Sequence, residues 1–96
     1  MQITIQTQRG VKHCFSQLPE KIMDFFLSHA DMYHTPTTIA LNINEPVFSV
    51  RDYVNILRKN SYVTKMPQHG NVFHITRENM EFWRTDFKNH IMSKLR

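Results

Sequence analysis

The chain of 96 residues contains one cysteine, two glycines and no long apolar run. A single cysteine, Cys14, excludes an internal disulfide and is typical of a reducing compartment. No stretch is apolar for long enough to span a bilayer, and the first ten residues alternate where a signal peptide would be continuously apolar. With 41% hydrophobic and 21% charged residues, we expect a soluble, cytoplasmic protein that folds as a single domain over residues 1–96.

Motifs for catalysis and for metal binding are also missing. The sequence has no glycine-rich phosphate loop, no nucleophile beside a base in a known motif, and no acidic pair at a useful spacing. His13 adjoins Cys14, but neighbouring side chains of a strand point to opposite faces and form no dyad. The six histidines lack the spacing of a zinc site, and His29 is expected to be a hydrogen-bonded residue of the core or its edge. We therefore expect neither an enzyme nor a bound metal or other cofactor.

A positive charge balance is present instead. The formal net charge is +4 and the sequence pI is about 9.5. Residues 49–77 hold five basic residues against one acidic residue, so this stretch alone carries a net charge of +4. Because the rest of the chain is then close to neutral, the sequence predicts a localised surface for an anionic partner.

The first half of the chain is expected to contain a strand segment and two helices. Residues 2–15 alternate with a period of two around an Arg9-Gly10 turn, which predicts one strand or a hairpin. Apolar residues at helical spacing predict a helix over 19–33. Thr35 is expected to cap a short helix that begins at Pro36. The residues that this short helix should bury are Ile39, Ala40 and Ile43.

A second helix of the pair is expected after a sharp turn. Asn44 tolerates the left-handed conformation that such a turn requires, and Pro46 suits the first helical position. The helix should end near Asn60, again in a left-handed cap. The apolar residues expected on its buried face are Val50, Tyr53, Val54 and Leu57.

The period then changes from that of a helix to that of a strand. Residues 62–66 and 72–76 are predicted strands, and 67–71 is the turn that joins them into a hairpin. Thr76 is expected to cap a last helix. The apolar stripe of that helix consists of Met80, Trp83, Phe87, Ile91 and Leu95.

This α+β order of elements resembles a winged helix-turn-helix domain, in particular the small winged-helix repressors of archaea and their viruses. The residues that carry the resemblance are Thr35-Pro36-Thr37-Thr38-Ile39-Ala40-Leu41-Asn42-Ile43-Asn44, Val50, Tyr53-Val54, Leu57, Lys59-Asn60-Ser61-Tyr62-Val63, Gly70 and Phe73-His74-Ile75-Thr76. It covers 19–77. The segment 1–18 lies outside the family core, and 78–96 forms the C-terminal helix. The chain has Asn44 and Glu45 where the wider class often has glycine and an apolar residue.

The resemblance implies sequence-specific binding to double-stranded DNA by a transcriptional repressor. Helix 46–60 would enter the major groove, which is wide enough for one helix, and hairpin 62–76 would be the wing. Arg51 is the strongest candidate for a base contact, because a guanidinium can bind a guanine edge with two hydrogen bonds. Other candidates are Ser49 and Asn55 for base edges or phosphate, and Val47 or Phe48 for a thymine methyl.

Further candidates would contact the DNA backbone. Basic side chains after the middle of the helix would bind phosphates and position the protein; they are Arg58, Lys59 and Lys65. The start of the short helix offers amides and hydroxyls to a phosphate at Thr35, Thr37 and Thr38. The tip of the wing would reach the minor groove or its backbone through Gln68, His69 and Asn71.

The apolar stripe of the last helix allows two interpretations. It is longer than a small domain usually needs, which favours a homodimer through Met80, Trp83, Phe87, Ile91 and Leu95. A two-fold dimer would present two recognition helices to half-sites about one helical turn apart. The alternative is that this helix packs onto the first helix of its own chain.

Two other functions remain open on the sequence. A winged-helix module can also bind proteins, in which case Val47 and Phe48 would form an apolar docking patch. The chain could instead bind DNA without sequence preference, as an architectural or replication-associated protein. Basic residues around the predicted recognition helix favour nucleic acid over the protein partner.

Overall fold

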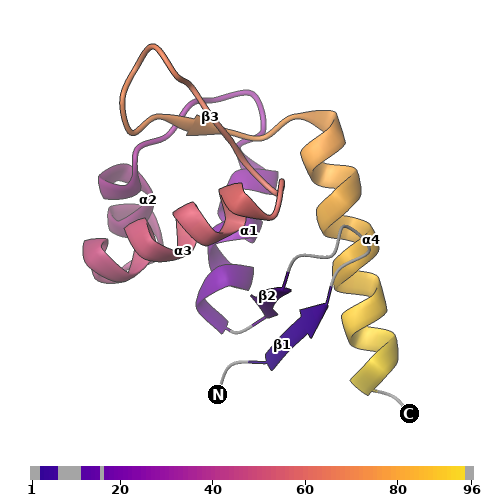
Figure 1. Ribbon diagram of the computed structural model, residues 1–96. Coiled ribbons are helices and arrows are strands. Elements are labelled where there is room, and N and C mark those ends of the chain that lie inside the picture. The colour runs from indigo at the N-terminus through magenta and orange to yellow at the C-terminus, as the bar shows by residue number, and fades with distance from the viewer. Residues whose placement is uncertain (1–2, 7–11, 16, 95–96) are drawn as a thin grey trace.

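The computed structural model describes residues 3–6, 12–15 and 17–94, and within them it has a helical core and two short antiparallel hairpins (Figure 1). The elements in chain order are β1 (Ile3–Gln6), β2 (Lys12–Phe15), α1 (Gln17–Ser28), α2 (Pro36–Ile43), α3 (Val47–Lys59), β3 (Thr64–Lys65), β4 (Phe73–His74) and α4 (Arg77–Lys94). In the first hairpin Ile3 lies opposite Phe15. The turn predicted at Arg9-Gly10 lies outside the described residues. No helix in the described ranges is both long and apolar enough to cross a membrane.

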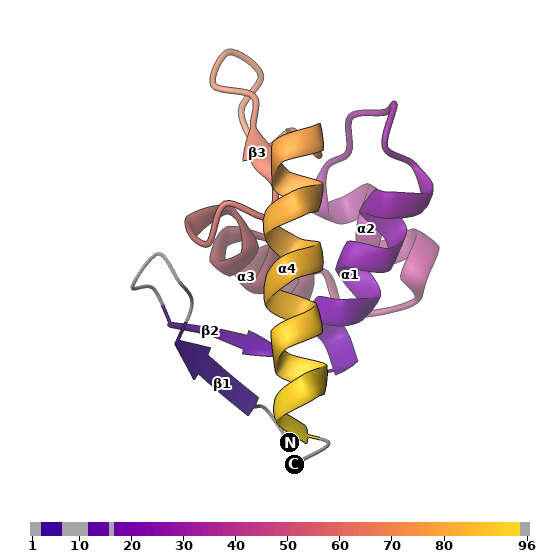
Figure 2. The same ribbon diagram turned by 90° about the vertical axis from the view of Figure 1, so that its right-hand side faces the viewer.

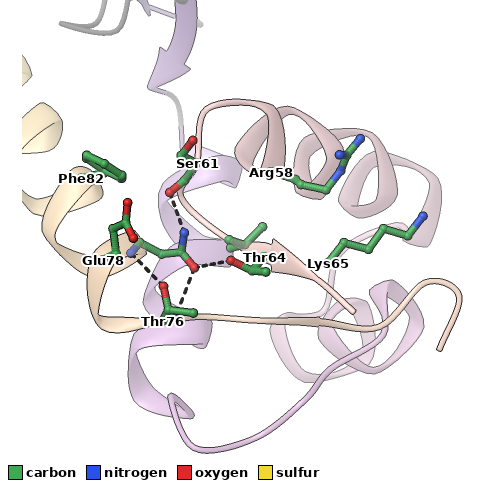
Figure 3. Close-up of a pocket in the computed structure, with 9 residues that line it drawn as sticks. Arg58, Ser61, Thr64, Lys65, Thr76, Glu78 and Phe82 are labelled. Carbon is green, nitrogen blue, oxygen red and sulfur yellow. Dashed lines mark hydrogen bonds between the residues drawn. The ribbon is translucent and has the colours of Figure 1, made fainter. Parts of the chain in front are cut away.

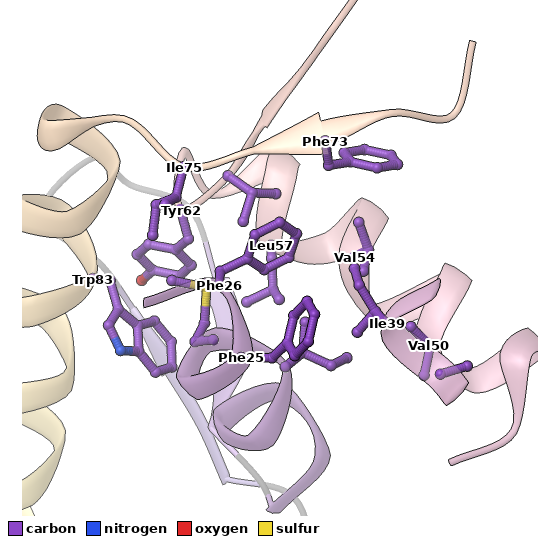
Figure 4. Close-up of a cluster of buried hydrophobic side chains, with 14 residues drawn as sticks. Phe25, Phe26, Ile39, Val50, Val54, Leu57, Tyr62, Phe73, Ile75 and Trp83 are labelled. Atoms are coloured by element: carbon purple, nitrogen blue, oxygen red, sulfur yellow. The ribbon is translucent and has the colours of Figure 1, made fainter. Parts of the chain in front are cut away.

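Helices α1, α2 and α3 meet around one hydrophobic core, and α4 covers its side (Figure 4). In Figures 1 and 2, α2 and α3 cross at a steep angle, as a turn of only three residues between them requires. The core residues with no exposed surface come from these helices; they are Ile22, Met23, Phe26, Ile39, Val50 and Val54. Their spacing along each helix is the amphipathic pattern that the sequence predicts.

Both ends of α2 match their prediction. The Thr35 side chain caps the helix by accepting a hydrogen bond from the Thr38 amide at 3.2 Å, and Pro36 follows as the first helical residue. At the other end Asn44 has φ 57° and ψ 52°, the left-handed conformation that asparagine tolerates. Ile39 and Ala40 are buried, whereas Ile43 is only partly buried against the core.

Helix α1 is shorter than predicted, ending at Ser28 instead of residue 33. The chain turns at His29, whose carbonyl accepts a hydrogen bond from the Met32 amide at 3.1 Å. Five residues later His34 is extended and exchanges two 2.8 Å backbone hydrogen bonds with Phe73. A helix continuing to residue 33 could not deliver His34 to this bridge, so tertiary pairing overrides the helical pattern.

The ends of α3 differ slightly from their prediction. Pro46 is extended, with φ −61° and ψ 134°, so it precedes the helix and Val47 begins it. At the other end the predicted left-handed residue, Asn60, has φ −92°, and Ser61 takes that conformation instead with φ 67°. The left-handed residue lies one position later because Asn60 still bonds its backbone amide to the Ile56 carbonyl.

The β3–β4 hairpin is present between α3 and α4 but is much shorter than predicted. Each strand has two residues, with Thr64 opposite His74 and Lys65 opposite Phe73. Tyr62 and Val63 are buried in the core before the strand begins. The bridge between His34 and Phe73 occupies the other edge of β4 and compensates for the short pairing.

Helix α4 begins with a reciprocal cap. The Asn79 amide donates to the Thr76 hydroxyl at 3.1 Å, and the Asn79 side-chain carbonyl accepts from the Thr76 amide at 2.9 Å. Trp83 is only 5% exposed and packs on the chain's own core, so its prediction as a dimer contact is wrong. The other stripe residues are Met80 and Phe87, which are partly buried against the same core, and Ile91 and Leu95, whose side chains lie outside the described residues.

Candidate nucleic-acid interface

Helix α3 has one face in the core and one in solvent. Val50 and Val54 are fully buried and Leu57 is 2% exposed, which fixes the rotation of the helix about its axis. The opposite face presents four charged side chains and one aromatic side chain to solvent. These exposed residues are Phe48, Arg51, Asp52, Arg58 and Lys59. The amphipathic pattern thus leaves a basic helix face to which none of the described residues provides an ion-pair partner.

The N-terminal turn of α3 separates the two predicted apolar contacts. Val47 is partly buried and packs against the core, so less of its side chain is available for the predicted DNA or protein contact. Phe48 is 71% exposed, and the guanidinium carbon of Arg51 lies 5.3 Å from the centre of its ring. Ser49 is half-buried. Phe48 and Arg51 are therefore the side chains that project from this part of the helix.

The polar residues further along α3 differ in whether their side chains already make hydrogen bonds within the chain. The Asn55 amide nitrogen donates to the Arg51 carbonyl at 3.1 Å, so one of its donors is already used within the helix. Arg58 and Lys59 are exposed in the last turn, where cations also favour the negative end of the helix dipole. Both carry positive charge toward solvent without an ion-pair partner in the described part of the chain.

Arg58 and Lys65 extend toward the same side, away from α4 (Figure 3). They line a shallow hollow of about 440 Å³ between the end of α3, β3 and the start of α4. Asn79 also lines this hollow, and its side chain accepts a hydrogen bond from the Thr64 hydroxyl at 2.8 Å and donates one to the Ser61 carbonyl at 2.8 Å. Asn79 thereby fixes β3, and with it Lys65, relative to the end of α3.

The predicted contacts at the start of α2 are partly engaged within the chain. The Thr35 hydroxyl caps the helix and lies 3.0 Å from the Thr38 hydroxyl. Thr37 and Thr38 are exposed, while Thr35 is half-buried. Only Thr37 among the three has a hydroxyl with no hydrogen bond to another described residue.

The tip of the β3–β4 hairpin is exposed at all three predicted positions, Gln68, His69 and Asn71. Gly70 has φ 68°, a conformation that glycine adopts without strain. An apolar hollow of about 300 Å³ lies beside the tip, lined by Tyr33, Met66, His69 and Val72. In Figure 2 the hairpin and α3 lie to one side of α4, with α1 and α2 on the other.

Sequence reasoning missed three surface or structural features of this region. Leu41 on α2 is 78% exposed, and Tyr33 before α2 is 62% exposed with its ring edge-on to His74 at 5.2 Å. Leu41 could have been found, because it falls off the helical face of Ile39 and Ala40. Asn79 could not, since its partners are brought together only by the tertiary fold.

One histidine in the connection before α2 is buried. His34 is 4% exposed and packs edge-on against Phe25 and Phe26, with ring centroids 4.7 Å and 5.6 Å away. Removal from water lowers the pKa of His34 below its ordinary value, although a hydrogen bond to the His29 carbonyl opposes the shift. His29 itself is exposed and stacks on Phe25 at 4.4 Å, with Nδ1 2.9 Å from the Phe25 carbonyl oxygen. Among the described residues no three metal-ligating side chains gather at one point.

Comparison with known proteins yields no relative. No protein-family model, no curated protein and no solved structure matches the chain.

Proposed function

We propose that this chain is a winged helix-turn-helix protein that binds double-stranded DNA with sequence specificity and acts as a transcriptional repressor. In this proposal α3 is the recognition helix in the major groove, and the β3–β4 hairpin is the wing. The element order and the steep crossing of α2 and α3 support the assignment. The α+β fold itself is compatible with this proposal and with its alternatives, so it does not discriminate between them.

One observation carries the proposal: the solvent face of α3 is basic and continues onto β3. Arg51, Arg58 and Lys59 leave the helix on its solvent side, and Lys65 extends from β3 to the same side as Arg58. None of these four side chains has an ion-pair partner among the described residues, so their charges are available to an anionic partner such as the phosphates of DNA. Phosphate contacts by Arg58, Lys59 and Lys65 would position the protein, and Arg51 would contact bases.

A homodimer belongs to the proposal as well. Met80 and Phe87 are partly exposed on α4, whereas Trp83 is used within the chain. A two-fold pair would present two copies of α3 about 34 Å apart along one face of the duplex. Sedimentation equilibrium of the free protein and of its DNA complex tests this part separately, with a monomer on DNA as the contradicting result.

The experiment for the proposal is fluorescence anisotropy with labelled duplexes across a salt series. We expect tight binding to the DNA upstream of the chain's own gene, falling steeply as salt rises because phosphate contacts release counterions. Arg51→Ala should remove the preference for this DNA over a random duplex. Arg84→Ala is the matched control, because Arg84 is also an exposed arginine but lies on α4.

Two results would replace the proposal. Equal binding to upstream and random DNA would indicate the architectural function without base recognition. No binding to either duplex at low salt would favour a protein-interaction module. That second function has its own support, since Leu41 and Phe48 are 78% and 71% exposed on α2 and α3.

A further inference from the structure

Two side chains that contact each other form the exposed front of α3. The guanidinium carbon of Arg51 lies 5.3 Å from the centre of the Phe48 ring. Such a cation–π contact restricts the long arginine side chain to the neighbourhood of the ring. Because the residues are three positions apart, both project from the same side of the helix.

Neither of these two side chains belongs to the hydrophobic core. The neighbouring residues Val47 and Val50 pack on the core, whereas Phe48 is 71% exposed. Arg51 is also exposed and has no ion-pair partner among the described residues. Its guanidinium donors and one edge of the Phe48 ring are therefore both presented to a ligand.

We infer, on the basis of the proposed function, that Phe48 and Arg51 together recognise a thymine and a guanine in adjacent base pairs. Arg51 would donate two hydrogen bonds to O6 and N7 of guanine, and Phe48 would contact the 5-methyl group of thymine. The guanidinium carbon of Arg51 and the centre of the Phe48 ring are 5.3 Å apart, and successive base pairs are about 3.4 Å apart, so the two groups are close enough to contact neighbouring base pairs.

Polar neighbours on α3 contribute less to this recognition. Ser49 is half-buried, and the Asn55 amide nitrogen already donates to the Arg51 carbonyl at 3.1 Å. Asp52 is exposed but repels phosphates and guanine acceptors alike. Sequence preference is thus concentrated in the Phe48–Arg51 pair, and the thymine and guanine are recognised jointly because the arginine is held against the ring.

The test begins with selection of binding sites from 30-bp duplexes that carry a randomised centre. We expect the selected sites to share a thymine next to a guanine. In one such site deoxyuridine then replaces that thymine, which removes only the methyl group. Wild-type protein should bind the deoxyuridine duplex about fourfold more weakly. Phe48→Ala should bind both duplexes with equal, reduced affinity.

Matched variants separate recognition from charge. Lys59→Ala should weaken binding to both duplexes by the same factor, because Lys59 is exposed outside the pair. Circular dichroism should show Phe48→Ala folded as wild type, since Phe48 is 71% exposed and does not belong to the core cluster. Selected sites without the thymine–guanine step, or equal wild-type affinity for both duplexes, would overturn the inference while leaving DNA binding intact. Failure to bind any duplex at low salt would instead overturn the proposed function.

Discussion

The phenolic hydroxyl of Tyr62 donates a 2.7 Å hydrogen bond to Oδ2 of Asp86, between the base of the β3–β4 hairpin and α4. Tyr62 is 1% exposed and Asp86 is 4% exposed. The Tyr62 ring also packs edge-on against Trp83, with centroids 5.1 Å apart. These contacts attach α4 to the segment that leads from α3 into β3.

Removal of the Tyr62 hydroxyl should destabilise the protein without changing its surface. We expect Tyr62→Phe to lower the free energy of unfolding by about 2 kcal/mol, the usual range for a hydrogen bond to a charged group. Urea denaturation followed by circular dichroism measures the loss. Tyr33→Phe is the control, since Tyr33 is 62% exposed and should change stability by less than about 0.5 kcal/mol. A similar loss in both variants would contradict the role of the buried hydroxyl.

Substitution of Asn79 should destabilise the protein more than substitution of a typical capping residue does. Its side chain bonds the Thr76 amide, the Thr64 hydroxyl and the Ser61 carbonyl, and the residue is 6% exposed. We expect Asn79→Ala to cost about 3 kcal/mol, because three hydrogen bonds of about 1 kcal/mol each are lost. Thermal unfolding measures this cost.

The control for Asn79 is Asn42→Ala. Asn42 is exposed and donates a single bond to the Thr38 carbonyl at 2.8 Å. Its loss should cost less than about 1 kcal/mol. Equal costs for the two variants would show that Asn79 acts only as a local cap.

Burial of His34 should make the protein less stable in mild acid. Its pKa is lowered in the folded state by removal from water, so below about pH 6.5 the unfolded chain binds a proton that the folded chain excludes. The free energy of unfolding should therefore fall as pH drops from 7 to 5, until the folded-state pKa is passed. His34→Gln should reduce this slope, whatever its stability at pH 7.

Chemical denaturation at several pH values measures the His34 effect. His69→Gln is the control, because His69 is exposed at the hairpin tip and should leave the slope unchanged. An unchanged slope in His34→Gln would contradict the prediction.

The phosphate contacts of the proposed DNA complex can be counted by salt dependence. Each phosphate neutralised contributes about −0.9 to the slope of log K against log salt. Lys65→Ala should therefore make the slope shallower by about that amount and weaken binding to all duplexes equally. Lys88→Ala on α4 should leave the slope unchanged, and an equal effect of both variants would contradict the assigned DNA face.

The ion pair between α1 and the α2–α3 turn should contribute little to the free energy of unfolding. Lys21 Nζ lies 2.8 Å from Glu45 Oε2, but the two side chains are 41% and 30% exposed. Because solvent screens such pairs, Lys21→Ala should lower the free energy of unfolding by less than about 1 kcal/mol. Denaturation should show a smaller difference from wild type at 1 M salt than at 0.1 M salt, because added salt screens an exposed pair further. A loss comparable to that of Asn79→Ala would contradict this ranking.

Local signals in the sequence were enough to predict that the four helices of the described part of the chain exist and that Thr35, Asn44 and Thr76 cap two of them. Thr35, Asn44 and Thr76 each act through neighbours within four positions, so a short segment contains all the information. Helical spacing also predicted three buried residues of α3, Val50, Val54 and Leu57, whereas Tyr53, predicted with them, is only partly buried. Features that depend on distant partners were predicted poorly, as the early end of α1 and the two-residue strands show.

In the candidate site, too, the sequence predicted some features better than others. Exposure of Arg51 and Phe48 follows from their position opposite Val50 and Val54, and the structure has both in solvent. Trp83 was assigned to a dimer contact although it packs on the chain's own core, because the sequence does not identify what an apolar side chain packs against. Only packing decides whether such a residue covers its own core or another molecule.

Pairing of Phe73 with both Lys65 and His34 has a consequence for how the molecule opens. Strands of two residues are not stable alone, so β4 persists only while the connection before α2 holds its far edge. The amides of His34 and Phe73 should therefore exchange with deuterium together, at the rate of global unfolding. The amide of His69, at the hairpin tip, should exchange orders of magnitude faster by local fluctuation.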